Sequence, residues 1–191
     1  MFPAGRASGA PGDHLATRYS WQVPLTVDLG YKPIPQLYLG AYFGFSLGAE
    51  GNQAQVESWC VDDDNDLEND IACSSHTLSA GLAVQYHLAP GAHWNPWVGY
   101  GIGVEAASQS ISDRPRGRSE STTSRGVTFA ALSAGADLRH VLGFGPYGQV
   151  AIGRFNSTRT EINDVERFDG SIDDRALHYW LELGLRMVLR P

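Results

Sequence analysis

The stretch YSWQVPLTVDLGYKPIPQLYLGAYFGFSLG, residues 19–48, alternates between large apolar residues and polar or small residues in two successive runs. In residues 19–31 the large apolar residues stand at the odd positions: Tyr19, Trp21, Val23, Leu25, Val27, Leu29 and Tyr31. Residues 37–47 repeat the pattern with Leu37, Leu39, Ala41, Phe43, Phe45 and Leu47. Because side chains alternate across a β-strand, each run predicts a strand with one apolar and one polar or glycine-rich face. The apolar face must meet either a protein core or lipid.

The alternation continues to the end of the chain and predicts seven strands in total. Five further segments carry it: residues 76–88, 96–106, 128–140, 146–155 and 177–189. Short turns are expected at 32–35, 89–95 and 141–145, and long polar connections at 49–75, 108–125 and 156–175. Several long structureless loops are uncommon in a compact soluble domain. A regular exchange of short turns and long loops is typical of a transmembrane β-barrel.

Composition narrows the class of protein. The chain has 191 residues, 42% of them hydrophobic, with 22 Gly and a net charge of -7. This length is enough for one domain with a sizeable core. No apolar run approaches the roughly 18 residues of a membrane helix. The negative charge, with no basic stripe, argues against a nucleic-acid partner. We divide the chain into a loop-like segment, residues 1–18, and a β-barrel domain, residues 19–191.

Several features favour lipid over a soluble core. Each segment has about the 9 to 11 residues that a tilted strand needs to cross a bilayer. Aromatic residues near the strand ends resemble an interfacial girdle: Tyr19, Trp21, Tyr31, Tyr86, Trp94 and Trp97. Seven apolar faces are too bulky for the interior of a small barrel, whereas the glycine-rich faces suit it. We therefore expect an all-β, antiparallel, up-and-down transmembrane barrel whose apolar faces point outward, with Leu82, Ile102, Leu132 and Leu183 near mid-membrane.

The phrases YLGAYFGFSLG, NPWVGYGIGVE and GPYGQVAIGRF, with the loop asymmetry, resemble the small bacterial outer-membrane β-barrels, the family of outer membrane protein A- and X-like eight-stranded barrels. WQVPLTVDLGYKPIPQLYLGAY and LHYWLELGLR are similar to predicted myxobacterial outer-membrane barrels. The resemblance covers most of residues 19–190 and implies architecture, without a catalytic signature. Chains of this family often finish on an aromatic residue that the assembly machinery recognises, whereas this one ends in MVLRP.

The seven predicted strands are one fewer than the eight of this family. Single-chain bacterial barrels have even strand numbers, so one strand is missing from the pattern. Residues 1–18 have no apolar region of a signal peptide and contain Pro3, Gly5, Gly9, Pro11 and Gly12. We expect an outer loop there, with Met1 at the outer end of a missing first strand. The alternative is that the first and last visible strands pair directly, in parallel, in an odd-numbered closure.

The longest polar connection contains an acidic run and both cysteines. Asp62, Asp64 and Asp66 have the spacing that begins an EF-hand loop, but Leu67 and Cys73 replace its turn glycine and bidentate glutamate. A solvated surface loop is the simpler interpretation, with a loose divalent-cation site as the alternative. A disulfide between Cys60 and Cys73 is expected if the protein is exported. It would staple this loop and remove about 3 kcal/mol of unfolded-chain entropy.

Charged residues on the polar faces are expected to form a network inside the barrel, since buried charges must be paired. The predicted members are Asp28, His87, Glu105, Asp137, Arg139, His178, Glu182 and Arg186. A catalytic interpretation requires a Ser–His pair at matching depth on a lipid-accessible face. No such pair is visible, so we expect no catalytic residues, no resident metal and no cofactor.

These features predict a non-enzymatic, integral outer-membrane protein of a Gram-negative envelope. Its role would be structural or in surface contact, with at most slow, porin-like passage of small solutes. Its expected partners are outer-membrane lipid, lipopolysaccharide and the assembly machinery, and it is expected to be a monomer. Two alternatives belong to other classes: a membrane-embedded lipid-modifying enzyme using His178 and Glu182, and a soluble lipocalin-like binder with an apolar cavity.

Overall fold

The computed structural model describes residues 1–51, 71–113, 117–138 and 142–189, and most of them lie in strands. One mixed sheet contains nine strands. Their bounds are β1 (Phe2–Gly5), β2 (Tyr19–Ile34), β3 (Leu37–Glu50), β4 (Ile71–His87), β5 (Trp94–Asp113), β6 (Arg118–Leu138), β7 (Leu142–Ile162), β8 (Val165–Ser171) and β9 (His178–Leu189). One short helix, α1, spans Leu15–Arg18.

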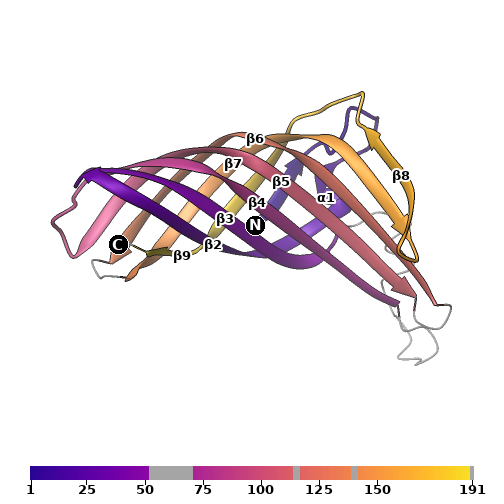
Figure 1. Cartoon of the computed structure of the whole chain (residues 1–191), viewed down its shortest axis with the longest axis horizontal. Coiled ribbons are helices and arrows are strands. Elements are labelled where there is room, and N and C mark those ends of the chain that lie inside the picture. The colour runs from indigo at the N-terminus through magenta and orange to yellow at the C-terminus, as the bar shows by residue number, and fades with distance from the viewer. Residues whose placement is uncertain (52–70, 114–116, 139–141, 190–191) are drawn as a thin grey trace.

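The sheet curves into a closed ring. Strands β2 to β7 pair with their neighbours in chain order, all antiparallel, and β9 pairs with both β7 and β2. Figure 1 shows the ring from the side, with the β2–β3 and β4–β5 connections at one end and α1 and β8 at the other. We call these the short-turn end and the long-connection end. The seven alternating segments of the sequence all belong to this ring.

The ring closes at a seam where β9 changes partner. Residues Thr26–Leu29 of β2 pair in parallel with Arg186–Leu189 of β9. Nearer the long-connection end, β1 pairs antiparallel with β9, from Phe2 opposite Leu181 to Gly5 opposite His178. Met1 also exchanges backbone hydrogen bonds with Gln22 of β2. Direct parallel pairing, the exceptional closure in the sequence argument, is therefore present, and the sheet is mixed rather than purely antiparallel.

The expectation that residues 1–18 form only a loop is wrong. This segment contains β1 and α1. The edge of β9 next to β1 would otherwise leave backbone N–H and C=O groups unpaired, and even four residues of β1 satisfy part of that edge. Pro24, which has no N–H to donate, lies between Gln22 and the parallel ladder that starts at Thr26.

The apolar faces of the strands point out of the ring, as the alternation predicts. Leu82, Leu132 and Leu183 expose 64%, 55% and 64% of their surface, while Ile102 exposes 47%. Exposed Leu, Val, Ile and Phe side chains occur on all seven ring strands, for example Leu25, Phe43, Leu82, Ile102, Leu132, Val150 and Leu185. Among the described residues, no helix is both long and apolar enough to cross a membrane.

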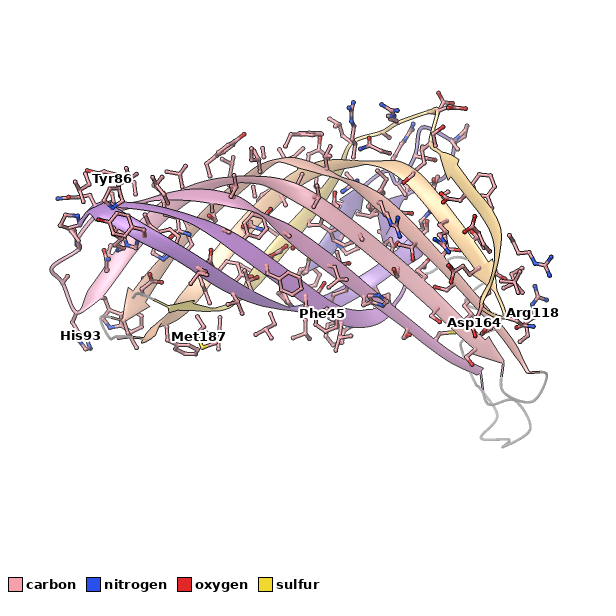
Figure 2. All side chains as sticks on the ribbon, viewed as in Figure 1. Phe45, Tyr86, His93, Arg118, Asp164 and Met187 are labelled. Carbon is pink, nitrogen blue, oxygen red and sulfur yellow. The ribbon has the colours of Figure 1, made fainter. Side chains whose placement is uncertain are left out.

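Two of the predicted girdle aromatics are placed differently. Trp21, Tyr31, Tyr86 and Trp94 are exposed on the outer face, and Figure 2 shows Tyr86 at the short-turn end. Tyr19 and Trp97, only 1% and 2% exposed, point into the ring instead. An irregularity in the β2–β3 register between Tyr19 and Gln22 turns Tyr19 inward. Trp97 follows the alternation of its strand, which places it on the inner face.

Glycines on the inner face make room for large aromatic rings. A Cβ atom on Gly81 would lie 2.7 Å from both Cε1 and Oη of Tyr42. Tyr38 crosses Gly30 and Gly40, and Trp97 crosses Gly135, in the same manner. The narrow ring accommodates inward Tyr and Trp side chains because the glycines beside them have no side chain of their own.

The strands extend well into the segments expected to be long loops. Strands β5 and β6 run to Asp113 and from Arg118, and β7 continues to Ile162 before a hairpin with β8. That hairpin turns at Asn163 and Asp164, whose φ angles of 51° and 60° suit a type I′ turn. Ser and Thr occupy both faces of β6 here, so the two-residue apolar period disappears although the backbone pairing continues.

The contact between Tyr42 and glycine leads to a stability prediction. Gly81→Ala places a methyl group against the Tyr42 ring and the Ile102 carbonyl. We expect the free energy of unfolding, measured by urea titration in detergent micelles, to fall by about 1–3 kcal/mol. Ala134→Val, which adds methyl groups on the exposed outer face, is the matched control and should change little. Equal effects of the two substitutions would contradict the assigned faces.

Candidate functional site

The interior of the ring is the candidate site, because it brings charged side chains together away from solvent. Its deepest cluster, toward the short-turn end, is centred on Arg186 of β9. Arg186 Nε donates to Asp28 Oδ2 at 2.7 Å, and Nη2 donates to Gln85 Oε1 at 2.8 Å. Asp137 Oδ1 lies 3.9 Å from Arg186 Nη1. Arg186 is 2% exposed, so solvent screens these contacts poorly.

Aromatic rings complete this cluster. The Arg186 guanidinium carbon lies 4.3 Å from the centroid of Trp97 and 5.7 Å from that of Tyr38, within reach of cation–π attraction. Trp97 Nε1 also donates to Asp137 Oδ1 at 3.0 Å. One guanidinium on β9 thus contacts two carboxylates, an amide and two rings, which come from β2, β3, β4, β5 and β6.

A second cluster lies nearer the long-connection end and is centred on Glu105 of β5. His178 Nε2 is 2.7 Å from Glu105 Oε1, and Trp180 Nε1 donates to Oε2 at 3.0 Å. Phe155 stacks on the His178 ring with centroids 4.2 Å apart. Tyr19 meets Trp180 edge to face and donates its hydroxyl to the Ala107 carbonyl at 3.0 Å. Both oxygens of the buried carboxylate therefore have a partner.

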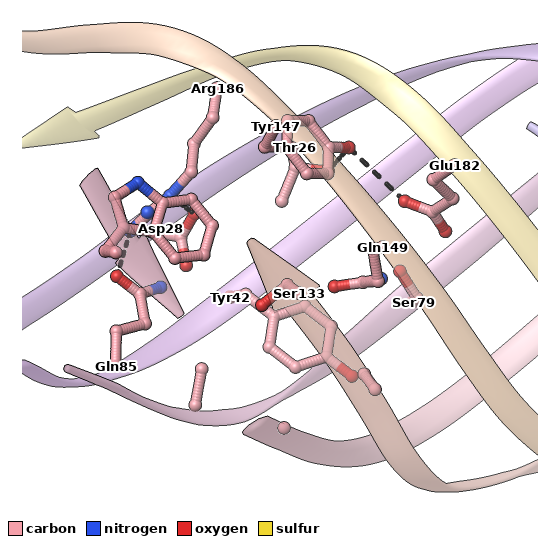
Figure 3. A pocket seen from close by; sticks show the side chains of 14 residues that line it. Thr26, Asp28, Tyr42, Ser79, Gln85, Ser133, Tyr147, Gln149, Glu182 and Arg186 are labelled. Atoms are coloured by element: carbon pink, nitrogen blue, oxygen red, sulfur yellow. Dashed lines mark hydrogen bonds and ion pairs between the residues drawn. The ribbon is translucent and has the colours of Figure 1, made fainter. Parts of the chain in front are cut away.

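Between the two clusters the interior contains two small polar cavities of about 40 and 30 Å³. Five residues line both cavities: Thr26, Tyr42, Ser79, Gln149 and Glu182. The Tyr147 hydroxyl lies 3.3 Å from Glu182 Oε2 and 3.1 Å from Thr26 Oγ1. Figure 3 shows these side chains converging on the same space, with Arg186, Asp28 and Gln85 at one side. Each cavity is large enough for a water molecule.

The segment before β2, residues 6–18, lies at the long-connection end and covers part of the interior of the ring. Leu15 of α1 is fully buried in a cluster with Tyr19, Phe155 and Trp180. Arg18 forms a bidentate ion pair with Asp13, with Nε 2.6 Å from Oδ1, and Gln109 donates to the Arg18 carbonyl. The helix α1, with Leu15 pointing into this cluster, therefore covers the interior at this end, and we call α1 the plug. The sequence of residues 6–18 does not predict this arrangement, because the segment is rich in turn residues and a single buried residue, Leu15, produces no periodic pattern.

The predicted interior residues are brought together only in part. Asp28, Asp137 and Arg186 form one cluster and Glu105 and His178 another, so the expected single network is divided. Glu182 faces the cavities between them, and His87 pairs with Asn95 near the short-turn end, with Nδ1 2.7 Å from Nδ2. Arg139 lies outside the described residues.

Other predicted sites fall largely outside the described part of the chain. Asp62, Asp64 and Asp66 lie outside it, as does Cys60. Cys73 lies in β4. The Cys60–Cys73 disulfide and the acidic cation site therefore stay predictions.

The polar network also includes residues that the sequence argument left out. Gln22, 1% exposed, receives hydrogen bonds at Oε1 from Ser46 and Thr77 and donates from Nε2 to Ser75. Tyr38, Gln85, Tyr147 and Trp180 likewise contribute polar atoms or rings. Their inward parity is visible in the sequence, but an uncharged side chain does not need a partner of opposite charge, so charge pairing alone does not predict these residues.

The two ring nitrogens of His178 differ in their surroundings. Nε2 is bonded to Glu105, whereas Nδ1 has no hydrogen-bond partner among the residues that the structure describes. The same residues contain no group of three or more His, Cys, Asp and Glu side chains arranged to hold a metal ion.

Comparison of the chain with family models, with curated proteins and with solved structures finds no match.

The Arg186 cluster leads to a prediction about buried charge. Arg186→Leu leaves the Asp28 and Asp137 carboxylates without their guanidinium. We expect the free energy of unfolding in micelles to fall by about 3–5 kcal/mol, since an uncompensated buried charge is costly. Arg159→Leu is the matched control: Arg159 pairs with Glu161 and Glu166 at half-exposed positions, and its loss should cost less than about 1 kcal/mol. Similar losses for both variants would show that Arg186 is not effectively buried.

Proposed function

We propose that this protein is an integral outer-membrane β-barrel whose outer face contacts lipid. One observation carries the proposal: large apolar side chains are exposed around the whole ring, while charged and amide side chains fill its interior. In water, such an outer face would leave a far larger apolar surface exposed than soluble monomers tolerate. In a bilayer the same arrangement is favourable, because lipid covers the apolar side chains of the outer face, which we call the belt, and the closed sheet satisfies the backbone groups.

The proposed orientation follows from the two ends of the ring. The short-turn end would face the periplasm, and the long-connection end, with the β7–β8 hairpin and the plug, would face outward. Tyr31, Tyr86 and Trp94, exposed near the short-turn end, would lie in the interfacial region, where amphipathic aromatic rings are favoured. Lipid and lipopolysaccharide are then the immediate partners, and the barrel is a monomer.

The function we propose is structural, with surface contact through the outer hairpins. The Arg186 cluster, the Glu105 cluster and the plug fill the interior with packed and hydrogen-bonded side chains, which favours a stable, nearly closed barrel over an open pore. The enzyme alternative gains no support, because His178 and Glu182 both face the interior rather than the lipid. The lipocalin alternative requires a large apolar cavity, whereas the two cavities between the clusters are small and lined largely by polar side chains.

The location is tested by expressing the chain in a Gram-negative host behind a cleavable export signal. We expect it in the outer-membrane fraction, migrating faster on a gel before boiling than after, because a folded barrel resists detergent. Arg186→Leu provides the comparison for folding, since it should lower the temperature at which the band shifts. A chain that stays soluble at high concentration without detergent would overturn the proposal.

Contact between the belt and lipid is tested by placing a charge in it. Leu132→Arg and Leu183→Arg should each lower the folding free energy in lipid vesicles by about 2–4 kcal/mol, the cost of a cation near the bilayer midplane. Val165→Arg, also on an exposed apolar residue but on β8 beyond the ring, is the control and should have little effect. No penalty at Leu132 and Leu183 would mean that the belt does not meet hydrocarbon.

A further inference from the structure

We infer that the space around Glu182 is a binding site for one monovalent metal cation, of the sodium or potassium type. Glu182 projects from β9 into the two cavities that separate the Arg186 and Glu105 clusters. No ion pair joins its carboxylate to a cationic side chain among the described residues, unlike Asp28, which meets Arg186 at 2.7 Å. Its hydrogen-bond partners are the neutral hydroxyl of Tyr147 and the amide of Gln149.

The local balance of charge calls for a counter-ion. Within the described interior, two cationic groups, the Arg186 guanidinium and the Met1 amine, face four carboxylates. The carboxylates are those of Asp28, Asp137, Glu105 and Glu182. Arg186 contacts Asp28 and Asp137, and His178 and Trp180 bond Glu105. The Met1 amine lines the smaller cavity and its charge acts on Glu182, but its hydrogen bond goes to the Gln22 carbonyl. Two cations do not balance four carboxylates, and burying an uncompensated charge is unfavourable.

The cavity walls supply the atoms that a hard cation requires. Six oxygen-bearing side chains from five different strands line the larger cavity around Glu182. They are Thr26, Tyr42, Ser79, Ser133, Tyr147 and Gln149. Hard cations bind several oxygen ligands at once, with water completing the shell. A proton alone would neutralise Glu182 but would leave most of these oxygens unused.

The donor set also selects the charge of the ion. The charged groups that line each cavity sum to one negative charge: Asp28, Glu182 and Arg186 in the larger cavity, and Glu105, Glu182 and the Met1 amine in the smaller one. A single positive charge balances that sum. A calcium ion would leave an excess charge in a poorly screened interior, and protein calcium sites gain affinity from additional carboxylates. The two cavities have volumes of about 40 and 30 Å³, and together they have room for an ion and a few water molecules.

The test measures ion binding directly on the whole 191-residue chain folded in detergent micelles. Equilibrium dialysis with radioactive sodium, in choline chloride at constant ionic strength, should give one bound ion per wild-type chain. Potassium should compete with it. Glu182→Gln should abolish binding, whereas Asp169→Asn, which removes an exposed carboxylate on β8, should leave it unchanged.

Unfolding temperatures provide a second readout. Replacing choline by sodium or potassium should raise the wild-type midpoint and leave that of Glu182→Gln unmoved, because an ion bound only to the folded state stabilises it. Ser79→Ala, which removes a cavity hydroxyl without altering the carboxylate, should weaken sodium affinity several-fold and keeps the test valid if Glu182→Gln does not fold.

Three results would overturn the inference: no stoichiometric ion in the wild type, binding of calcium but not of sodium or potassium, or equal binding by wild type and Glu182→Gln. Because all measurements are made in micelles, they do not depend on where the protein resides in a cell. Failure here is therefore distinguishable from failure of the proposed outer-membrane location.

Discussion

Closure of the sheet through β9 is the constraint on which the rest of the structure depends. Each strand offers backbone donors and acceptors on both of its sides, and an open edge leaves one row of them without partners. β9 satisfies this requirement by pairing with β7 on one side and successively with β1 and β2 on the other. Once the ring is closed, every side chain must lie either in a narrow interior or on a broad outer face.

That division explains the contrasting compositions of the two faces. The outer face has unlimited room and carries branched and aromatic side chains. The inner face has little room, so Tyr38, Tyr42 and Trp97 fit only where glycines lie opposite. The polar clusters then fill the spaces between these rings. Arg186 is effective because it reaches carboxylates, an amide and aromatic faces from a single position on the last strand.

The alternating pattern of the sequence was sufficient to predict the seven ring strands and the face on which most of their side chains lie. It failed where local backbone geometry changes parity, as at Tyr19, where the register between β2 and β3 is irregular. It also failed where both faces are polar, as in Ser119–Ser124 of β6, because alternation requires contrast. The Phe2–Gly5 strand was too short to produce a pattern.

The site could be predicted only as a set of inward residues, not as clusters. Parity determines the face of a side chain, whereas its depth depends on the stagger between strands and on bulges, which the sequence does not reveal. Glu105 and His178 are 73 residues apart and still in contact, and nothing in the local sequence of either residue indicates the other. The plug was missed for a similar reason, because Leu15 is buried by distant residues.

The seam between β2 and β9 affects the kinetics of folding. Most neighbouring strands of the ring are also neighbours in the chain, so their pairing requires closure of only short loops. The Asp28–Arg186 contact spans 158 residues and belongs to the one junction that joins the two ends of the sheet. Contacts of such high sequence separation form late, after the loop-closure entropy has been overcome. That entropy grows only logarithmically with length, so a curled sheet already formed from hairpins brings the two edges near one another at modest cost. We therefore expect the final step of folding to be the pairing of the first and last long strands, and the rate of that step to determine how long both edges remain open.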